Sequence, residues 1–356
     1  MNYLVFGGTG SLGRKLINRL GGRNITVYSR DEAKHWTIRN EMGPSQPSFI
    51  VGDIRDSQRV FDAINKVRPD RIIVAAALKH VDTCESSPYE SIQTNVLGTK
   101  NVIDAANHLY STTDWGGSGN VKTVTFVSTD KACAPVNSYG MCKALSERLI
   151  TSQKPKDNGL TFNAVRYGNV LESRGSIIPL FRYQCESADQ ITVTDPNMTR
   201  FVMTLDDSVN LIFAMLANGR NGQIGIPQLP AMRIGDLSEI FAETFGKTIR
   251  HIGLRPGEKM HEDLINESES IRTTVEDANG FYSNDKMLYG RMPTGDNIFL
   301  INDALSKPIT TLQWSYSSNQ MVMSKEQLRA HLTKLGIINA PLSSFIGQQI
   351  EEIRND

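Results

Sequence analysis

The chain opens with MNYLVFGGTGSLGRKLI, and residues 3–13 of this stretch decide the fold. Tyr3–Phe6 is a short apolar run typical of a buried strand, and glycines follow it at positions 7, 10 and 13. The pattern then turns helical to about Leu20. Glycines let backbone N–H groups approach a pyrophosphate closely, and a helix N-terminus attracts negative charge. A strand, a glycine turn and a helix in this order predict the first unit of a dinucleotide-binding fold.

Short apolar runs alternate with amphipathic helices through the next 150 or so residues. We expect strands at 25–28, 49–51, 71–77, 121–128 and 161–166, with helices between them. This alternation is typical of an α/β protein with a Rossmann-type, doubly wound parallel sheet. Beyond about residue 170 the elements shorten and prolines become frequent, which predicts a smaller C-terminal α/β substrate lobe. We therefore expect an NADP-binding Rossmann domain at 1–168, a substrate-binding lobe at 169–275 interleaved with returning Rossmann elements, and a C-terminal extension at 276–356, with a helix capped by Ser324.

The bulk composition argues against several classes of function. The chain has 38 basic and 38 acidic residues, so bulk charge favours neither nucleic acid nor a membrane surface as a partner. The longest apolar run, Ile72–Leu78, is too short to span a bilayer, and the first strand begins too early for a signal peptide. We expect a soluble cytoplasmic protein without a metal site, whose thiols are reduced and buried. The cysteines are Cys84, Cys133, Cys142 and Cys185.

The end of the second strand predicts which nicotinamide cofactor binds. NAD enzymes place an acid there that accepts hydrogen bonds from the ribose hydroxyls. Here the strand ends in Ser29 and Arg30, which together with Lys34 can hold a 2′-phosphate by charge-assisted hydrogen bonds. Asp31 comes one residue late and can instead cap a helix. The pattern favours NADP.

Other cofactor candidates each have a plain structural alternative. Asp53 follows the third strand and suits the adenine amino group, although a helix N-cap explains it almost as well. Three alanines end the fourth strand, where the cofactor would lie against the backbone or where small residues simply pack. The predicted cofactor residues are Gly7, Thr9, Gly10, Ser11, Leu12, Gly13, Ser29, Arg30, Lys34, Asp53, Ile54, Ala75, Ala76, Ala77, Asn95, Tyr139 and Lys143.

Two residue pairs carry the candidate chemistry. Tyr139 and Lys143 lie four residues apart on one helix face, where an ammonium can lower the pKa of the phenol for proton transfer. Asp130 and Lys131 stand at the end of the preceding strand, next to Thr129. Oxidation of an alcohol needs only the first pair, so the second indicates a further step. An ordinary helical surface pair and a structural ion pair are the respective alternatives.

These residues together resemble the extended short-chain dehydrogenase/reductase superfamily that acts on nucleotide sugars. Within it, the chain is similar to the CapD-like polysaccharide biosynthesis group, in particular to soluble UDP-N-acetylglucosamine 4,6-dehydratases that invert C5. The resemblance covers roughly the first 270 residues. It rests on SRD at 29–31, AALKHV at 76–81, STDK at 128–131, Tyr-x-x-x-Lys at 139–143, RYGNV at 166–170, SRGS at 173–176, MTRF at 198–201 and RPGEK at 255–259.

Asp130-Lys131 is the decisive comparison within this resemblance. Relatives that dehydrate dTDP-glucose with retention at C5 carry Asp-Glu there, and simple 4-epimerases carry neither pair. The resemblance implies that Tyr139 removes the O4 proton during oxidation at C4, while Thr129 or Ser128 hydrogen-bonds O4. It further implies that Lys131 removes the C5 proton, Asp130 protonates the departing C6 hydroxyl, and the hydride returns to C6. The NADP is then tightly bound and recycled in each turnover.

A sugar nucleotide carries a diphosphate, so the second lobe should supply cations. By resemblance, Asn95 supports Lys143 through water, although Asn95 could equally be a residue at a helix end. Relatives associate through helices like 88–110, and the resemblance therefore implies a homo-oligomer. A 4-epimerase or a C5-retaining dehydratase is the alternative among enzymes, and a non-catalytic NADP-binding redox sensor is the alternative of another class. The implied substrate-binding residues are Lys79, Asn169, Arg174, Ser176, Met198, Thr199, Arg200, Arg255 and Glu258.

Overall fold

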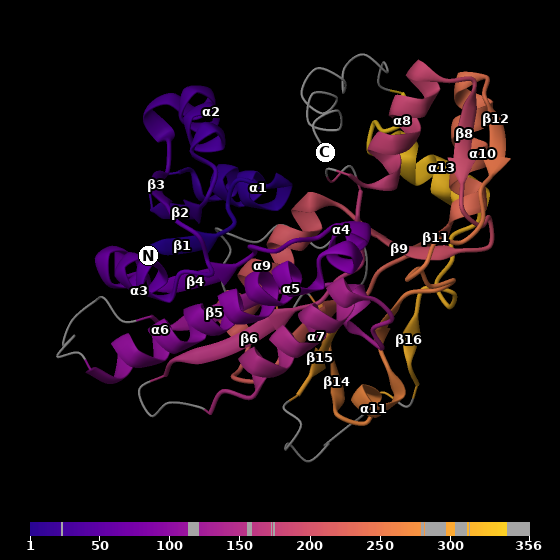
Figure 1. Ribbon diagram of the computed structural model, residues 1–356. Coiled ribbons are helices and arrows are strands. Elements are labelled where there is room, and N and C mark those ends of the chain that lie inside the picture. The colour runs from indigo at the N-terminus through magenta and orange to yellow at the C-terminus, as the bar shows by residue number, and fades with distance from the viewer. Residues whose placement is uncertain are drawn as a thin grey trace. The chain divides into compact units, whose positions relative to one another are not determined.

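The computed structural model describes residues 1–22, 24–112, 121–154, 159–171, 173, 175–278, 281, 297–302, 312 and 314–339. The chain divides into two compact units, each assembled from three separate segments (Figure 1). The first unit contains residues 1–167, 206–228 and 265–315, and the second contains 168–205, 229–264 and 316–356. Residues 276–356 were expected to form an extension. The described residues among them lie in both units, with 297–302 in the first and 316–339 in the second.

The first unit is built on a nine-stranded sheet of the predicted Rossmann type. Its order is β14-β15-β10-β6-β5-β4-β1-β2-β3, and all neighbours from β10 to β3 are parallel. β15 runs antiparallel to β10 and β14. The strand order reverses at β1, which is where doubly wound sheets bind dinucleotides. The strands are β1 (Tyr3–Phe6), β2 (Ile25–Ser29), β3 (Ser48–Val51), β4 (Arg71–Val74), β5 (Thr123–Val127), β6 (Thr161–Val165), β10 (Ile224–Pro227), β14 (Thr273–Asp277) and β15 (Asn297–Ile301).

Several helices of the first unit begin at side-chain caps. Asp56 caps α3 by accepting a hydrogen bond from Arg59 N, and Asn137 caps α7 through Gly140 N. α7 packs on β6 and on α6, as Figure 1 also shows. The helices are α1 (Ser11–Leu20), α2 (Glu32–Met42), α3 (Ser57–Val67), α4 (Val81–Ser86), α5 (Pro88–Ser91), α6 (Gly98–Thr112), α7 (Ser138–Thr151), α9 (Leu205–Asn218) and α11 (Glu267–Ser270), with 3-10 turns η1 (Gly43–Ser45) and η3 (Asp130–Ala132) and a π-helical turn η2 (Ile92–Leu97).

The second unit is the smaller α/β lobe that the sequence predicted. Three short sheets, ordered β11-β9-β7, β12-β8 and β13-β16, accompany helices α8 (Ile177–Ser187), α10 (Ile234–Phe245) and α13 (Lys325–Lys334). Phe181 of α8 and Phe241 of α10 meet edge to face in its core. The strands are β7 (Asn169–Val170), β8 (Gln190–Val193), β9 (Thr199–Met203), β11 (Ala231–Arg233), β12 (Thr248–His251), β13 (Asp263–Ile265) and β16 (Tyr316–Ser317).

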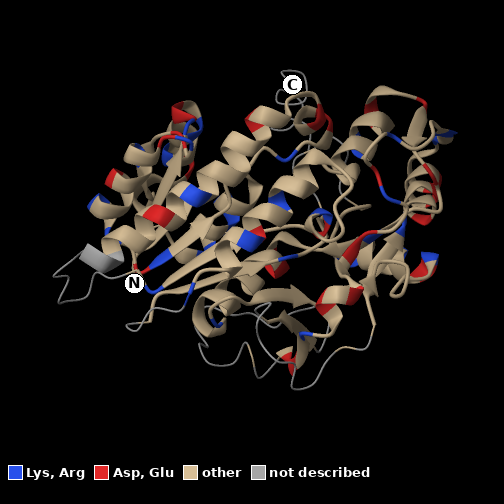
Figure 2. Ribbon diagram, turned by 60° about the horizontal axis from the view of Figure 1, so that its bottom comes forward, with Lys and Arg blue, Asp and Glu red and all other residues tan. Residues whose placement is uncertain are grey.

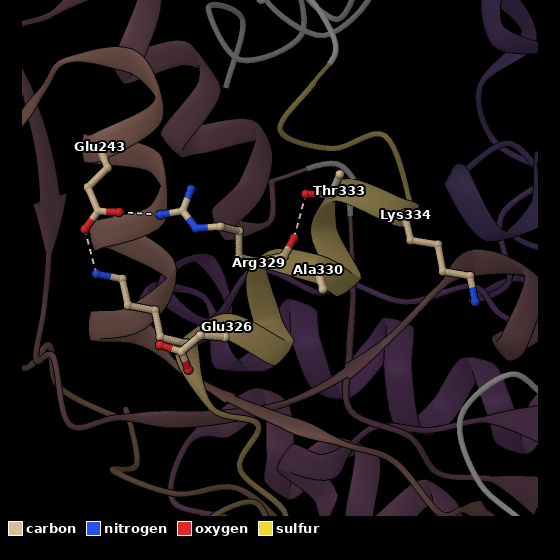
Figure 3. Close-up of a pocket in the computed structure, with 7 residues that line it drawn as sticks. Glu243, Glu326, Arg329, Ala330, Thr333 and Lys334 are labelled. Atoms are coloured by element: carbon tan, nitrogen blue, oxygen red, sulfur yellow. Dashed lines mark hydrogen bonds and ion pairs between the residues drawn. The ribbon is translucent and has the colours of Figure 1, made fainter.

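Helix α13 begins with the predicted cap. Ser324 Oγ accepts a hydrogen bond from Gln327 N at 3.3 Å, and Gln327 Oε1 accepts one from Ser324 N at 2.9 Å. Lys325 and Arg329 pair with Glu243 of α10 beside an open hollow of about 710 Å³ (Figure 3). These ion pairs are exposed, so packing of the apolar face of α13 contributes more to the docking than they do.

Basic and acidic residues occur in equal numbers along the chain. Figure 2 shows basic and acidic residues interspersed along the ribbon, as the balanced composition leads one to expect. Among the described helices, none combines the length and the apolar character needed to cross a membrane. Within the same residues, no group of three or more His, Cys, Asp or Glu side chains is arranged to hold a metal ion. The four cysteines are buried, and none of them forms a disulfide.

Candidate active site

The glycine turn joins β1 to α1 at the carboxyl edge of the sheet. Gly7 has φ +84°, and a Cβ there would lie 2.5 Å from Ala76 N, so both its conformation and its approach to the end of β4 require glycine. A Cβ on Gly13 would lie 2.2 Å from Gly8 O, so α1 packs directly on the turn. At Gly10, the N-cap of α1, no side chain caps the helix and nothing lies within 4 Å of a Cβ. The helix N-terminus is thus open to a phosphate, and the turn fits a dinucleotide.

The residues expected at a 2′-phosphate gather at the end of β2. Arg30 is more than half exposed, with its Nη1 3.7 Å from Asp53 Oδ2. Asp31 caps α2 by accepting a hydrogen bond from Lys34 N at 3.0 Å, and its Oδ2 lies 3.1 Å from Lys34 Nζ. Ser29 Oγ lies 2.7 Å from the imidazole of His35, a residue that the sequence reasoning did not single out. The carboxylate that follows β2 is therefore used in a helix cap.

Asp53 is held by a neighbour on its own loop. Its Oδ1 accepts from Arg55 N at 2.9 Å, and its Oδ2 accepts from Arg55 Nε at 3.0 Å and Nη2 at 2.8 Å. Burial alone would raise the pKa of Asp53, but the hydrogen bonds from Arg55 outweigh burial and lower it. Asp56 caps α3, so the alternative of a helix N-cap at Asp53 was wrong. Its predicted contact with adenine stays a prediction.

Tyr139 and Lys143 lie one turn apart on α7, and both are buried. Lys143 Nζ donates to Val127 O at 2.7 Å and lies 4.4 Å from the centroid of the Phe126 ring. Burial lowers the pKa of Lys143 to about 8. Burial also raises the pKa of Tyr139 to about 12, and the charge that most opposes this rise is Lys131. The sequence led us to expect that Lys143 lowers the pKa of Tyr139. In the structure, the Lys143 ammonium is turned to the backbone of β5 instead.

Local packing explains why Lys131 lies near the phenol. A Cβ on Gly140 would come within 2.2 Å of Lys131 O, so glycine beside Tyr139 lets α7 pack directly on η3. A hydrogen bond from Thr129 also lowers the pKa of Tyr139. The chain thereby brings Thr129, Lys131 and Tyr139 together.

Asp130 and Lys131 form a close pair directly after β5. Asp130 Oδ1 accepts from Thr129 Oγ1 at 2.9 Å and from Lys131 Nζ at 3.1 Å. Asp130 is 1% exposed and the Lys131 side chain 23%. Asp130 Oδ2 and Ser128 Oγ are buried and have no hydrogen-bond partner among the described residues. Buried polar atoms normally find partners, so these two oxygens are suited to a ligand or a proton.

Asn95 fixes the loop after β4. It lies in η2, inside a continuous helical run, so the alternative of a helix-end residue was wrong. Its Oδ1 accepts from Leu78 N at 2.8 Å, and its Nδ2 donates to Leu78 O at 2.9 Å. Its carbonyl oxygen accepts from Thr99 Oγ1 at 2.7 Å and from Ser146 Oγ at 2.9 Å. π-helical turns often occur at functional sites, and this one is pinned to α7 through Ser146.

Several predicted substrate residues belong to the second unit, while Lys79 lies exposed in the first. Asn169 begins β7 and Ser176 is the N-cap of α8. Asn169 Oδ1 and Ser176 Oγ are buried without a hydrogen-bond partner among the described residues, so Ser176 does not cap its helix. Arg174 lies outside the described residues.

The remaining predicted residues cluster around β9. Met198 is buried, and Thr199 Oγ1 lies 2.8 Å from His261 Nδ1. The guanidinium of Arg200 donates to three carbonyl oxygens, those of Thr199 at 2.7 Å, Lys259 at 3.0 Å and Met260 at 3.2 Å. The structure therefore uses Arg200 to hold the segment at 259–260.

Arg255 and Glu258, also predicted to bind the substrate, bind each other. Arg255 Nε donates to Glu258 Oε1 at 3.0 Å, and the Arg255 side chain is 70% exposed. An exposed guanidinium can exchange such a partner for a phosphate at small cost.

The sequence reasoning also missed a buried ion cluster on α7. Arg166 directly follows β6, and its guanidinium lies between the carboxylates of Glu147, one turn after Lys143, and Glu269. All three side chains are nearly inaccessible to solvent. A charged residue on the buried face of a helix, as at Glu147, was the signal that could have found it.

The amino-acid sequence of this chain is similar to those of known proteins. Residues 3–282 match the model of a family described as polysaccharide biosynthesis protein. UDP-glucose 4-epimerase of Rickettsia typhi is 40% identical over 290 residues, which are 78% of this chain and 81% of that protein. UDP-N-acetylglucosamine 4,6-dehydratase (inverting) of Campylobacter jejuni is 38% identical over 279 residues, 76% of this chain and 79% of that protein.

Solved structures share the fold. Pen from Bacillus thuringiensis is 34% identical, with a TM-score of 0.80 over 94% of this chain and 98% of that one. The dTDP-glucose 4,6-dehydratase DesIV from Streptomyces venezuelae, solved with NAD and TYD bound, is 23% identical, with a TM-score of 0.62 over 73% of this chain and 87% of that one. At that identity the likeness shows the fold alone.

Proposed function

The chain belongs to the family of polysaccharide biosynthesis proteins, and from this premise we propose that it is an NADP-dependent UDP-N-acetylglucosamine 4,6-dehydratase that inverts C5. Its product would be a UDP-4-keto-6-deoxy-L-hexosamine for surface glycans. One observation carries the proposal: a buried Asp130 paired at 3.1 Å with Lys131, next to Tyr139. Oxidation at C4 needs a base such as Tyr139, and loss of water needs an additional acid and base.

The proposed choice of NADP rests on the end of β2. Asp31 caps α2, while Arg30 is an exposed cation beside Ser29. A cation and a hydroxyl suit a 2′-phosphate, whereas NAD enzymes present an acid to the ribose. The turn from Gly7 to Gly13 would hold the pyrophosphate at the N-terminus of α1. When bound, the nicotinamide would supply a hydride acceptor for the oxidation at C4 and a hydride donor for C6.

For the oxidation, Tyr139 would remove the proton from O4. Its pKa is raised to about 12 by burial, so it needs help to lose its own proton near neutral pH. Lys131 and the hydrogen bond from Thr129 both favour the tyrosinate. The hydroxyl of Ser128 has no partner among the described residues and would hydrogen-bond the sugar O4.

For the loss of water, the two partners of the ion pair would act together. The 4-ketone acidifies the C5 proton, which passes to the Lys131 amine, and a proton from the Asp130 carboxyl goes to the C6 hydroxyl, which leaves as water. A C5=C6 double bond forms, and the pair changes from its neutral form to an ion pair. Across the contact at 3.1 Å, the proton that Lys131 carries during the oxidation would first pass to Asp130, which leaves the Lys131 amine free to act as the base. Protonation of C5 from the opposite face then gives inversion.

The second unit would bind the diphosphate and the sugar. The buried oxygens of Asn169 and Ser176 lack partners among the described residues, and Ser176 stands at an uncapped helix N-terminus. An uncapped helix N-terminus suits a phosphate, and the exposed Arg255 adds a cation. Arg200 would instead shape the segment at 259–260, which its guanidinium already holds.

A homo-oligomer is the proposed assembly. Apolar side chains are exposed on the run from α5 to α6 and on the adjacent α7, whose elements pack together. Tyr89 is 68% exposed, and Met141 and Leu145 are about half exposed. An exposed apolar face of this kind is typical of an interface between protein chains. The residues are Tyr89, Ile92, Leu97, Met141 and Leu145.

A nucleotide-sugar 4-epimerase is the second candidate, favoured by the name of the Rickettsia typhi relative. Epimerisation at C4 needs the Tyr139 step and a rotation of the keto sugar. It leaves Asp130 and Lys131 without a chemical task. A C5-retaining dehydratase uses both pairs but reprotonates C5 from the original face.

Incubation with UDP-N-acetylglucosamine in deuterated water separates these reactions. We expect a 4-keto-6-deoxy product with deuterium at C5, the L configuration by NMR, and no net NADPH. A C4 epimer would establish the second candidate, and no reaction with several UDP- and dTDP-sugars would refute both. Lys131→Ala should lose dehydration and also slow oxidation at C4 without abolishing it, because Lys131 favours the tyrosinate as well. Lys100→Ala, at an exposed position on α6, should change neither step.

A further inference from the structure

The imidazole of His35 is buried directly behind the end of β2. It lies on α2, 2% exposed, with its Nε2 2.7 Å from Ser29 Oγ. Ser29 is the hydroxyl that, with Arg30, is proposed to meet the 2′-phosphate. His35 therefore contacts the Ser29 hydroxyl from the buried side, whereas the proposed 2′-phosphate would contact the same hydroxyl from the exposed side.

The surroundings of His35 hold its ring in place. The ring packs on Phe49 of β3, with centroids 4.6 Å apart and planes inclined by 33°. Arg39, one turn further along α2, lies over the same phenyl ring at 5.0 Å. The charged groups that act on His35 are Arg39, Asp31 and Glu32, all on α2, while β2 and β3 present Ser29 and Phe49. Burial first and Arg39 second lower the pKa of His35, so the imidazole is neutral near neutral pH.

A neutral imidazole can face Ser29 in two ways. If Nε2 carries the proton, it donates to Ser29 Oγ, and the serine proton is directed outward as a donor. If Nε2 is the acceptor, the serine proton points inward and only lone pairs face outward. A phosphate has only acceptor oxygens at neutral pH, so it requires the first arrangement. A ribose hydroxyl can donate or accept and is served by both.

We propose that His35 is a specificity-determining residue, which directs the Ser29 hydroxyl outward as a donor to the 2′-phosphate and so favours NADP over NAD. This inference rests on the proposed use of NADP. The alternative is that His35 only fills space between α2 and β3. In that case its replacement changes stability but leaves the preference between the two cofactors unchanged.

The test compares binding of NADPH and NADH to the full chain by fluorescence titration near neutral pH. His35→Phe keeps an aromatic ring on Phe49 and removes the hydrogen bond. We expect it to weaken NADPH binding about tenfold, the value of one hydrogen bond to a charged group, and NADH binding by less than about twofold. His35→Gln, which can still donate to Ser29, should recover part of the loss. The matched control is His108→Phe. His108 lies on α6 and packs edge-on against Phe61 of α3, and its replacement should change the binding of neither NADPH nor NADH.

Further measurements distinguish the possible failures. Ser29→Ala removes the donor itself, so adding His35→Phe to Ser29→Ala should cause little further loss, because His35 then has no hydroxyl to direct. In a ¹⁵N spectrum, 2′,5′-ADP should shift the tautomer of His35 toward protonated Nε2, and 5′-AMP should not. Equal binding of NADPH and NADH by the unmodified chain would overturn the proposed cofactor together with this inference. A preference for NADPH that survives in both His35→Phe and His35→Gln would overturn the inference alone.

Discussion

Replacement of Arg166 by Met is expected to destabilise the first unit strongly. The Arg166 guanidinium makes four hydrogen bonds, at 2.9 and 2.5 Å to Glu147 and at 2.8 Å to each carboxylate oxygen of Glu269. Methionine has a similar length but leaves two carboxylates buried without their cation. Breaking a buried ion pair in this way costs about 3–5 kcal/mol. For a unit of this size, the melting temperature should fall by about 6–20 °C.

The loss should also depend on pH in a defined direction. Burial would raise the pKa of Glu269, but Arg166 outweighs burial and holds the pKa below the ordinary value of 4.5. A depressed carboxyl pKa adds stability above that ordinary value, and the added stability disappears as the pH falls through the pKa of the folded state. Without Arg166, the buried carboxylates take up protons as the pH falls, and the folded variant becomes more stable because the unpaired charge is removed. The difference between the two proteins should therefore be largest near neutral pH and shrink toward about pH 4.

Urea unfolding followed by circular dichroism measures both effects. Lys100→Met is the matched control, because it removes a cation from an exposed ion pair and should cost less than about 1 kcal/mol. Adding Glu147→Gln and Glu269→Gln to Arg166→Met should restore part of the loss, since no unpaired charge remains buried. A loss equal to that of the control, or a loss independent of pH, would refute the reasoning.

Three further outcomes follow from the described geometry. Gly13→Ala should abolish NADPH binding in a fluorescence titration, because its Cβ would lie 2.2 Å from a backbone oxygen of the same turn. Gly10→Ala, which meets nothing within 4 Å, should leave the protein folded with the same melting temperature. Lys143→Met should slow oxidation at C4 less than Lys131→Ala does in a single-turnover assay, because Lys131 is the cation that most lowers the pKa of Tyr139, whereas Lys143 is turned to the backbone of β5. Leu145→Glu should convert the proposed oligomer to smaller species in light scattering, because it places a charge on an exposed apolar face.

The sequence alone predicted the features that depend on neighbouring residues. The glycine turn, the parallel strands, and the caps at Asp31 and Ser324 follow from conformational preferences within a few residues. The pairing of Asp130 with Lys131 was also predicted from neighbouring residues, and their side chains lie 3.1 Å apart in the structure. The family resemblance to polysaccharide biosynthesis proteins was likewise readable from short motifs, and the match over residues 3–282 confirmed it.

Only the tertiary structure decided which distant side chains meet. Helical spacing suggested Lys143 as the cation acting on Tyr139, but the close approach of Gly140 to η3 places Lys131 there instead. Within the expected C-terminal extension at 276–356, the structure adds β15 to the main sheet and packs α13 into the core of the second unit. The contact of His35 with Ser29 depends on β3 supplying Phe49 beneath the ring. Contacts of this kind depend on how separate elements pack. The pattern of residues along one element does not show which other elements will lie beside it.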